Sequence, residues 1–174
     1  IEGEAFFASS GTNIKITDYN DFSPPFAVTG GKQSRLIDFL YHKDYGKLPI
    51  IQGKESTGAN SIDVNNKTKK GVVVGGDFAN DKDTTLNCVL INFNSIKPQF
   101  THPQTPPHGY RSCVIYLTDK KLITCGTSGI DISNDGGKNW QLISNESFHV
   151  VQKAKNGSAV FLAGGKGRIA KVIF

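Results

Sequence analysis

The eight residues SNDGGKNW, Ser133 to Trp140, contain the only tryptophan of the chain, directly after a glycine-rich stretch. Two adjacent glycines supply the left-handed backbone angles that a tight reversal requires, and the Asp135 carboxylate can accept hydrogen bonds from backbone N–H groups of the turn. This pattern predicts a structural turn between two strands, with the indole ring packed against the sheet. A loop that grips a ligand is the alternative. The residues that set the spacing are Ser133, Asp135, Gly137 and Trp140.

The sequence on either side of this turn predicts a four-stranded antiparallel unit. Apolar and β-branched residues alternate with polar ones at the period of two that is typical of strands. Short turns separate the expected strands, which cover residues 110–117, 121–127, 129–135 and 140–144. Four antiparallel strands joined in this way describe one blade of a β-propeller.

Apolar runs that close with glycine or serine recur along the chain. The copies are FFASSGTN from Phe6, FAVTGGKQ from Phe26, VVVGGDFA from Val72, LITCGTSG from Leu122 and VFLAGGKG from Val160. The last four begin about 38 to 50 residues apart, a period that indicates propeller blades or solenoid repeats.

The chain is therefore expected to be all-β, a partial β-propeller of about four four-stranded blades. In the first blade, the leading strand is placed in EAFFASSG and the last strand in LPIIQ. The last blade lacks its outer strand, and we expect a segment N-terminal to Ile1 to supply it, because an unpaired edge exposes backbone donors and acceptors. The expected blades cover about residues 1–52, 53–105, 106–145 and 146–174.

The spacing S-x-D-x-G-x-x-W of the 133–140 turn resembles the Asp-box, or BNR repeat, of sialidase-like propellers. The resemblance implies that the turn lies at the periphery of its blade, away from any ligand. Longer phrases resemble bacterial propellers related to the plant photosystem II stability and assembly factor. These phrases are GKESTGANSI, VVVGGDFANDKDTTLNC, PPHGYRSCV and FLAGGKGRIAKV.

The second resemblance covers nearly the whole chain and implies the C-terminal part of a propeller with about seven blades. Several such bacterial proteins carry an oxidoreductase label. The sequence gives that label no support, because GGKGR near Gly164 opens no expected helix and therefore forms no nucleotide fingerprint.

Candidate ligand-binding residues lie in the loops that lead into the first strand of each expected blade. In a propeller these strands line the central channel, and their leading loops crowd one mouth of it. Carboxylates, imidazoles, a phenol and a guanidinium there could form an acid, a base and an anion clamp. The candidates are Glu4, Glu55, Asn60, His108, Tyr110, Arg111, Glu146 and His149.

Several of these candidates also have a structural explanation. Glu146 could cap a turn, His149 could be a satisfied core residue, and Tyr110 could pack between blades. Arg111, on an expected inner strand, must either face the channel or be buried with a partner, and we expect it to face the channel. Arg35 and Arg168 could form pairs between blades or join a basic channel lining.

Two classes of function fit these residues. The first is a non-catalytic, assembly-factor-like module that offers its channel mouth to a protein, peptide or glycan, and we favour it because no strong catalytic motif is present. The alternative is a sialidase-like glycoside hydrolase that uses carboxylates and arginine at the mouth. The arginines at positions 35 and 168 do not occupy the strand positions expected of a sialidase arginine triad.

Composition limits the partners. The net charge is +5, but the lysines are scattered along the chain. The densest group, Lys67 to Lys70, lies in an expected hairpin loop that is exposed to solvent. We therefore do not expect nucleic-acid binding. The three cysteines, Cys88, Cys113 and Cys125, are expected to be buried free thiols, although the last two could face each other across a hairpin.

No metal-ligand spacing and no residue cluster implies a metal or a cofactor. No stretch approaches the roughly 20 apolar residues that a membrane span needs. The expected location is the periplasm or the exterior of a bacterium.

Overall fold

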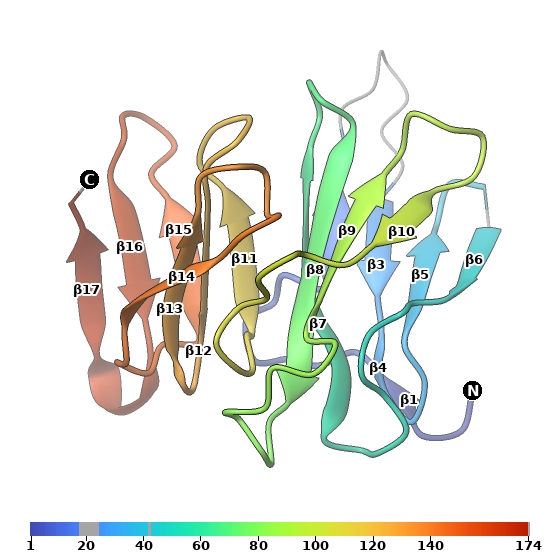
Figure 1. The fold of residues 1–174 in the computed structure, drawn as a ribbon, viewed down its shortest axis with the longest axis horizontal. Helices are drawn as coiled ribbons and strands as arrows, with labels where there is room; N and C mark the ends of the chain where they lie inside the picture. Colours follow the sequence, from blue (N-terminus) through green and yellow to red (C-terminus); the bar gives the residue numbers. More distant parts are fainter. Residues whose placement is uncertain (18–24, 42, 174) are drawn as a thin grey trace.

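The computed structural model describes residues 1–17, 25–41 and 43–173. The described chain is all-β and consists of several antiparallel sheets, with one short 3-10 turn, η1 (Gly165–Gly167), near its end (Figure 1). Parts of the expected first blade, residues 18–24 and 42, and the last residue of the expected fourth blade, Phe174, lie outside the described residues.

We name the sheets I to IV in chain order. Sheet I has the strand order β2-β3-β5-β6, sheet II β1-β4-β7-β8-β9-β10, sheet III β11-β12-β13-β14 and sheet IV β15-β16-β17. The strands of sheet I are β2 (Ile14–Ile16), β3 (Pro25–Val28), β5 (Arg35–Asp38) and β6 (Lys43–Lys47). Those of sheet II are β1 (Glu4–Ala5), β4 (Gly30–Gly31), β7 (Thr57–Asn65), β8 (Lys70–Asp77), β9 (Cys88–Asn92) and β10 (Gln99–Thr101). Those of sheets III and IV are β11 (Cys113–Tyr116), β12 (Leu122–Gly126), β13 (Gly129–Ser133), β14 (Gln141–Ser144), β15 (Val150–Lys153), β16 (Val160–Ala163) and β17 (Ile169–Val172).

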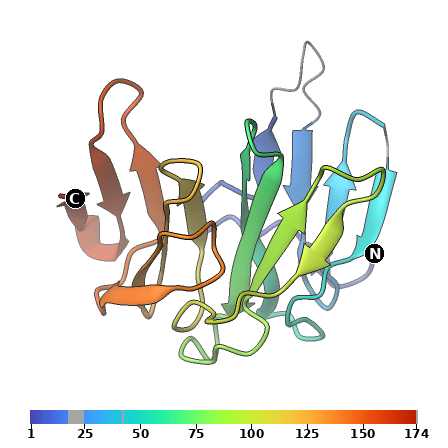
Figure 2. The same ribbon diagram turned by 45° about the horizontal axis from the view of Figure 1, so that its top comes forward.

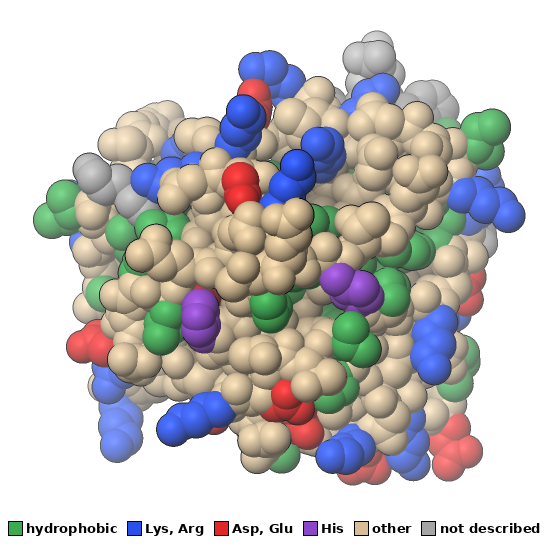
Figure 3. All heavy atoms as spheres, viewed as in Figure 1, with side chains coloured by type: hydrophobic (Ala, Val, Ile, Leu, Met, Phe, Trp, Pro, Cys, Tyr) green, Lys and Arg blue, Asp and Glu red, His purple; other side chains and the backbone are tan. Residues whose placement is uncertain are grey.

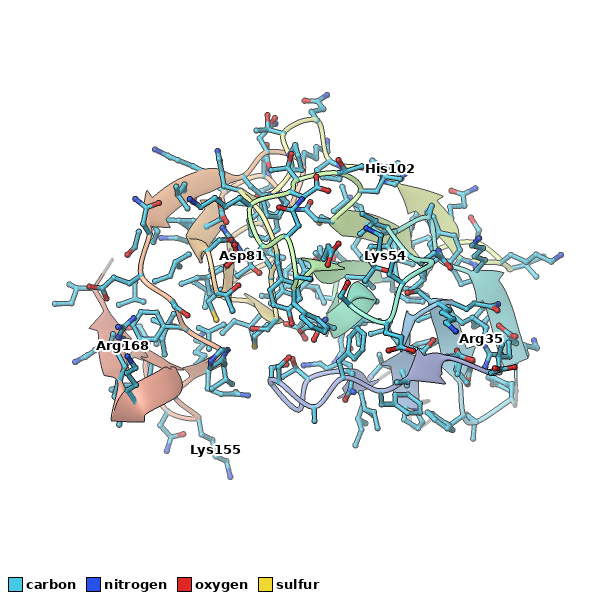
Figure 4. The ribbon with its side chains drawn as sticks, turned by 90° about the horizontal axis from the view of Figure 1, so that it is seen from below. Arg35, Lys54, Asp81, His102, Lys155 and Arg168 are labelled. Atoms are coloured by element: carbon cyan, nitrogen blue, oxygen red, sulfur yellow. The ribbon has the colours of Figure 1, made fainter. Side chains whose placement is uncertain are left out.

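The four sheets follow one another in chain order across the molecule, from sheet I beside the N-terminus to sheet IV at the C-terminus (Figures 1 and 2). Seen along the strands, they are arranged around an arc (Figure 4). Their leading strands, β2, β7, β11 and β15, lie side by side at the inner side of this arc.

Hydrogen bonds join these leading strands to one another. The backbone N–H of Ile62 on β7 donates to the carbonyl of Thr12, just before β2, at 3.0 Å. The N–H of Val114 on β11 donates to the Ser61 hydroxyl at 3.0 Å, and the Ser112 hydroxyl donates to the His149 carbonyl, just before β15, at 2.8 Å. Direct bonds between leading strands leave little room for the sheets to stack as two flat layers.

Each pair of neighbouring sheets shares an apolar core, because every sheet except those at the ends buries both faces. Sheets I and II meet through Phe26, Val28, Leu36, Ile62, Val73 and Ile91. Sheets II and III meet through Val72, Val74, Cys88, Val114, Leu122 and Trp140. Sheets III and IV meet through Cys113, Ile123, Cys125, Phe148, Val151 and Leu162.

Two strands of sheet I are not where the sequence predicts them. The leading strand is Ile14–Ile16, whereas Glu4–Ala5, inside the expected EAFFASSG strand, pairs with Gly30–Gly31 at the edge of sheet II. The last strand is Lys43–Lys47, not LPIIQ. The LPIIQ segment packs instead of pairing, because Leu48 and Ile50 fill the core between sheets I and II and proline lacks the N–H that a ladder needs.

The three cysteines are free and buried, as predicted. Cys113 and Cys125 are direct partners in the register of β11 and β12, so they do face each other across the hairpin. Burial raises the pKa of all three thiols.

We therefore expect all three thiols to be unreactive in the native protein, because the attacking species is the thiolate and these groups are both protonated and inaccessible. Titration with Ellman's reagent checks this. No thiol should react rapidly in buffer, and three should react after unfolding in guanidinium chloride. One rapidly reacting thiol in the native protein would show that the core between two sheets is open.

Candidate functional site

A buried ion pair lies just before β11. Arg111 and Asp131 both have side chains that are 0% exposed, and the Arg111 Nε donates to Asp131 Oδ2 at 2.6 Å. The remaining guanidinium nitrogens donate to the Tyr110 and His108 carbonyls and to the Ser128 hydroxyl. We expected Arg111 to face the channel. It is instead buried with a partner, which is the alternative that the sequence left open.

Asp131 also holds an imidazole. Nδ1 of His108 lies 2.6 Å from Asp131 Oδ1, while the His108 side chain remains 46% exposed. Asp131 therefore stands between a buried guanidinium and a solvent-accessible histidine, and one carboxylate fixes both. This arrangement positions the loop that leads into β11.

Asn60 and Tyr110 meet in a second polar group, on the inner side of β7. The Asn60 Oδ1 accepts hydrogen bonds from the Tyr110 hydroxyl at 3.1 Å and from the Ser9 hydroxyl at 2.8 Å. Burial raises the pKa of Tyr110, whose ring also packs edge-on against Phe78. Tyr110 thus packs between structural segments, and its phenol serves a hydrogen bond within the protein.

Glu4 belongs to a third group, with Arg35. Two parallel bonds of 2.8 Å join the Glu4 carboxylate to the Arg35 guanidinium, which also contacts Asp44 at 2.6 Å. Burial opposes ionisation of Glu4, but hydrogen bonds from Arg35 and Thr29 outweigh it and lower the pKa of the carboxyl. Glu4 is therefore committed to a bidentate pair that fixes the N-terminal segment to sheet I.

The other candidates stand alone. Glu55 and Glu146 are exposed, and the Glu146 backbone N–H, rather than its carboxylate, bonds to the Ser144 hydroxyl. His149 is half-buried and contributes its carbonyl to the bond with Ser112. The structure therefore brings Asn60 together with Tyr110 and His108 together with Arg111, and leaves Glu4, Glu55, Glu146 and His149 apart from both.

The three arginines do not converge. Arg35 pairs with Glu4, Arg111 pairs with Asp131, and Arg168 donates to the Ser147 carbonyl at 3.1 Å. Arg35 and Arg168 lie on opposite sides of the molecule (Figure 4). The set cannot clamp one substrate carboxylate.

Two buried aspartates were missed by the sequence reasoning. Asp131 is described above, and Asp63, on β7, accepts the Tyr116 N–H at 2.6 Å and pairs with Lys15 at 2.7 Å. Both lie in I-D-I or I-D-V stretches in the middle of a strand. An acid inside an apolar strand is a usable signal, because a buried carboxylate requires a partner.

The 133–140 turn is held by its own side chains. Ser133 donates its hydroxyl to Asp135 at 2.8 Å and accepts the Gly137 N–H at 2.9 Å, and the Asp135 carboxylate accepts the Asn139 N–H at 3.0 Å. Gly137 has a φ of 91°, and a Cβ there would lie 2.9 Å from the Leu90 side chain of sheet II. The turn therefore closes sheet III against sheet II through Gly137 and Trp140.

Comparison with known proteins gives the fold and little more. No family model matches the sequence, and no curated protein matches it. Among solved structures, YCF48 from Cyanidioschyzon merolae superposes with a TM-score of 0.55 and 14% sequence identity over 91% of this chain. The fold is propeller-like. The chain spans 50% of the length of this neighbour, and at such low identity the likeness concerns the fold alone.

The described residues form neither a membrane-spanning helix nor a metal-binding cluster. No helix among them has the length and apolar character that crossing a membrane demands. No group of three or more histidine, cysteine, aspartate or glutamate side chains within residues 1–17, 25–41 and 43–173 is arranged to hold a metal ion.

Proposed function

We propose that the chain is a non-catalytic binding module of a propeller, in the manner of the assembly-factor-like proteins that its sequence resembles. The binding surface is the rim formed by the loops that precede β7, β11 and β15, with His108, Glu55 and Glu146 as its exposed polar groups. The observation that carries the proposal is the engagement of Arg111 and Asp131 with each other inside the protein.

Glycoside hydrolysis fits this rim less well. That chemistry needs two carboxyl groups flanking one bond, about 5 to 9.5 Å apart, with one of them able to deliver a proton. Glu4 and Asp131 are both bound to guanidinium groups, so neither carboxylate is free to contact a substrate. The free carboxylates, Glu55 and Glu146, lead into β7 and β15, with β11 between them.

We also propose that further sheets of the same polypeptide cover the two ends of the arc. Ile14 and Ile16 on sheet I are 51% and 68% exposed, and Phe161 and Ile169 on sheet IV are 44% and 76% exposed. Apolar side chains on the outer faces of end sheets are the kind of surface that a neighbouring propeller sheet buries.

The test combines turnover with binding. The protein should not release fluorophore from a panel of 4-methylumbelliferyl glycosides. Peptides selected on the immobilised protein from a random phage library should bind it, and they should lose about tenfold in affinity to a His108→Ala, Glu146→Ala variant. The proposal would be contradicted, and the hydrolase favoured, if the unmutated protein released fluorophore and the Glu55→Gln variant did not.

A further inference from the structure

A groove of about 670 Å³ lies between sheets II and III, at the end of the strands opposite to the rim. Its floor is formed by Gly71, Leu90 and Ile91 of strands β8 and β9. Its wall is formed by the β11–β12 turn, around Lys120, and by the 133–140 turn. Figure 3 shows basic and acidic side chains gathered over the upper middle of this face.

The groove carries unpaired positive charge. Lys70, Lys120 and Lys138 line it, all three are exposed, and no ammonium group among them forms an ion pair with a described residue. They come from β8, from the β11–β12 turn and from the 133–140 turn, so cations from both sheets border one space.

The two acidic residues of the lining do not cancel this charge. Asp119 is bound by Lys67 at 2.7 Å, and Asp135 is occupied by Ser133 and Asn139 within its own turn. Counting Lys67 with the lining, four lysines face two aspartates, and the net charge is +2. An occupant that brings carboxylates would find lysines that no internal acid already occupies.

The groove also offers sites for uncharged polar groups. Thr68 lines it, and its hydroxyl oxygen, which is buried, has no hydrogen-bond partner among the described residues. Asn92, Gln99 and Asn134 add amide donors and acceptors.

β10, which contributes Gln99 and Thr101, is the last strand of sheet II, and its outer side pairs with no other strand of the described chain. An unpaired strand edge is a template for an extended peptide.

We propose that this groove binds an extended acidic segment of a partner protein. Carboxylates of the segment meet Lys70, Lys120 and Lys138, its apolar side chains rest on Leu90 and Gly71, and its backbone bonds to the edge of β10. A nucleic acid fits less well, because no arginine lines the groove and Tyr116 is its one aromatic residue. The surface is separate from the rim of the proposed function and does not depend on it.

The probe is a fluorescein-labelled ten-residue peptide of alternating glutamate and leucine, measured by fluorescence anisotropy. The folded protein should bind it, and the affinity should fall as sodium chloride rises. The Lys120→Glu, Lys138→Glu variant should lose at least about tenfold in affinity, because it turns two attractions into repulsions. The same peptide with glutamine in place of glutamate should bind about as weakly to both proteins.

A matched control separates the groove from general charge. Lys155→Glu, Lys171→Glu makes the same change in net charge on sheet IV, with both lysines exposed, and it should leave the affinity unchanged. Circular dichroism shows whether each variant is folded. Equal losses in the two charge-reversed proteins, absence of binding, or tighter binding of a ten-nucleotide single-stranded DNA would each overturn the proposal. A His108→Ala variant should bind the peptide normally, so a failure here is distinguishable from a failure of the rim.

Discussion

Replacing Asp131 with alanine is expected to lower the free energy of unfolding by about 3–5 kcal/mol. The Arg111 guanidinium is 0% exposed, and Asp131 is its one charged partner among the described residues. Removing the carboxylate leaves a buried cation with carbonyl and hydroxyl contacts alone, and desolvation of an uncompensated charge dominates the cost. Urea denaturation followed by tryptophan fluorescence measures the change.

A double variant gives the control. Arg111→Met with Asp131→Leu removes both charges and keeps apolar volume, so it should be more stable than either single variant. His108→Ala should cost less than Asp131→Ala, because its side chain remains 46% exposed. A loss below about 1 kcal/mol for Asp131→Ala would show that the pair is solvated, and Arg111 would again be a candidate for the channel lining.

Replacing Trp140 with alanine is expected to cost about 3–5 kcal/mol of unfolding free energy. The indole is 3% exposed and packs in the core between sheets II and III, with Val72, Val74, Cys88, Val114 and Leu122. Truncation leaves a cavity at a seam where two sheets meet, and neither sheet can collapse into it without losing its own pairing. Because fluorescence is lost with the tryptophan, circular dichroism in urea is the measurement.

Two variants in the same turn calibrate this result. Trp140→Phe should cost less, because it keeps most of the buried apolar area. Asn134→Ala should change little, because Asn134 is exposed. If Trp140→Ala unfolds at the same urea concentration as Asn134→Ala, the turn does not join the two sheets.

Local chemistry made the 133–140 turn predictable. Ser133, Asp135 and Gly137 bond within five residues of one another, so their spacing alone specifies the hydrogen bonds. The strands of sheet III followed from period-two alternation for the same reason. Structure that is determined by contacts within a few residues can be predicted without knowing which other segments pack against it.

Sheet I was less predictable because packing decides it. The segment KDYGK, which forms β6, has no apolar alternation, while LPIIQ has the residues of a strand but places Leu48 and Ile50 in a core shared with sheet II. Pairing of β1 with β4 is likewise set by two glycines that allow close approach of the backbones, since a Cβ at Gly31 would lie 2.2 Å from the Gly3 carbonyl oxygen.

The candidate site was predicted only as a region. The loops before β7, β11 and β15 were recognised, but nothing near Arg111 in sequence reveals Asp131, which lies twenty residues later on a strand two positions across the sheet. Likewise, nothing near Glu4 in sequence reveals its partner Arg35. Because each candidate is bound to such a partner, it is not available to a ligand. Partners this far apart in the sequence can be identified only from the three-dimensional structure.

The side-by-side leading strands determine how the four sheets are arranged, and nuclear Overhauser contacts test this neighbourhood directly. In a spectrum of uniformly ¹⁵N,¹³C-labelled protein, the amide proton of Val114 should show a contact with the β-protons of Ser61, and that of Tyr116 with the β-protons of Asp63. The bonds across this junction are 3.0 Å and 2.6 Å between heavy atoms, short enough for strong signals. Absence of both contacts in a fully assigned spectrum, with β11 instead close to β10 of another layer, would mean that the sheets do not fan around a common axis.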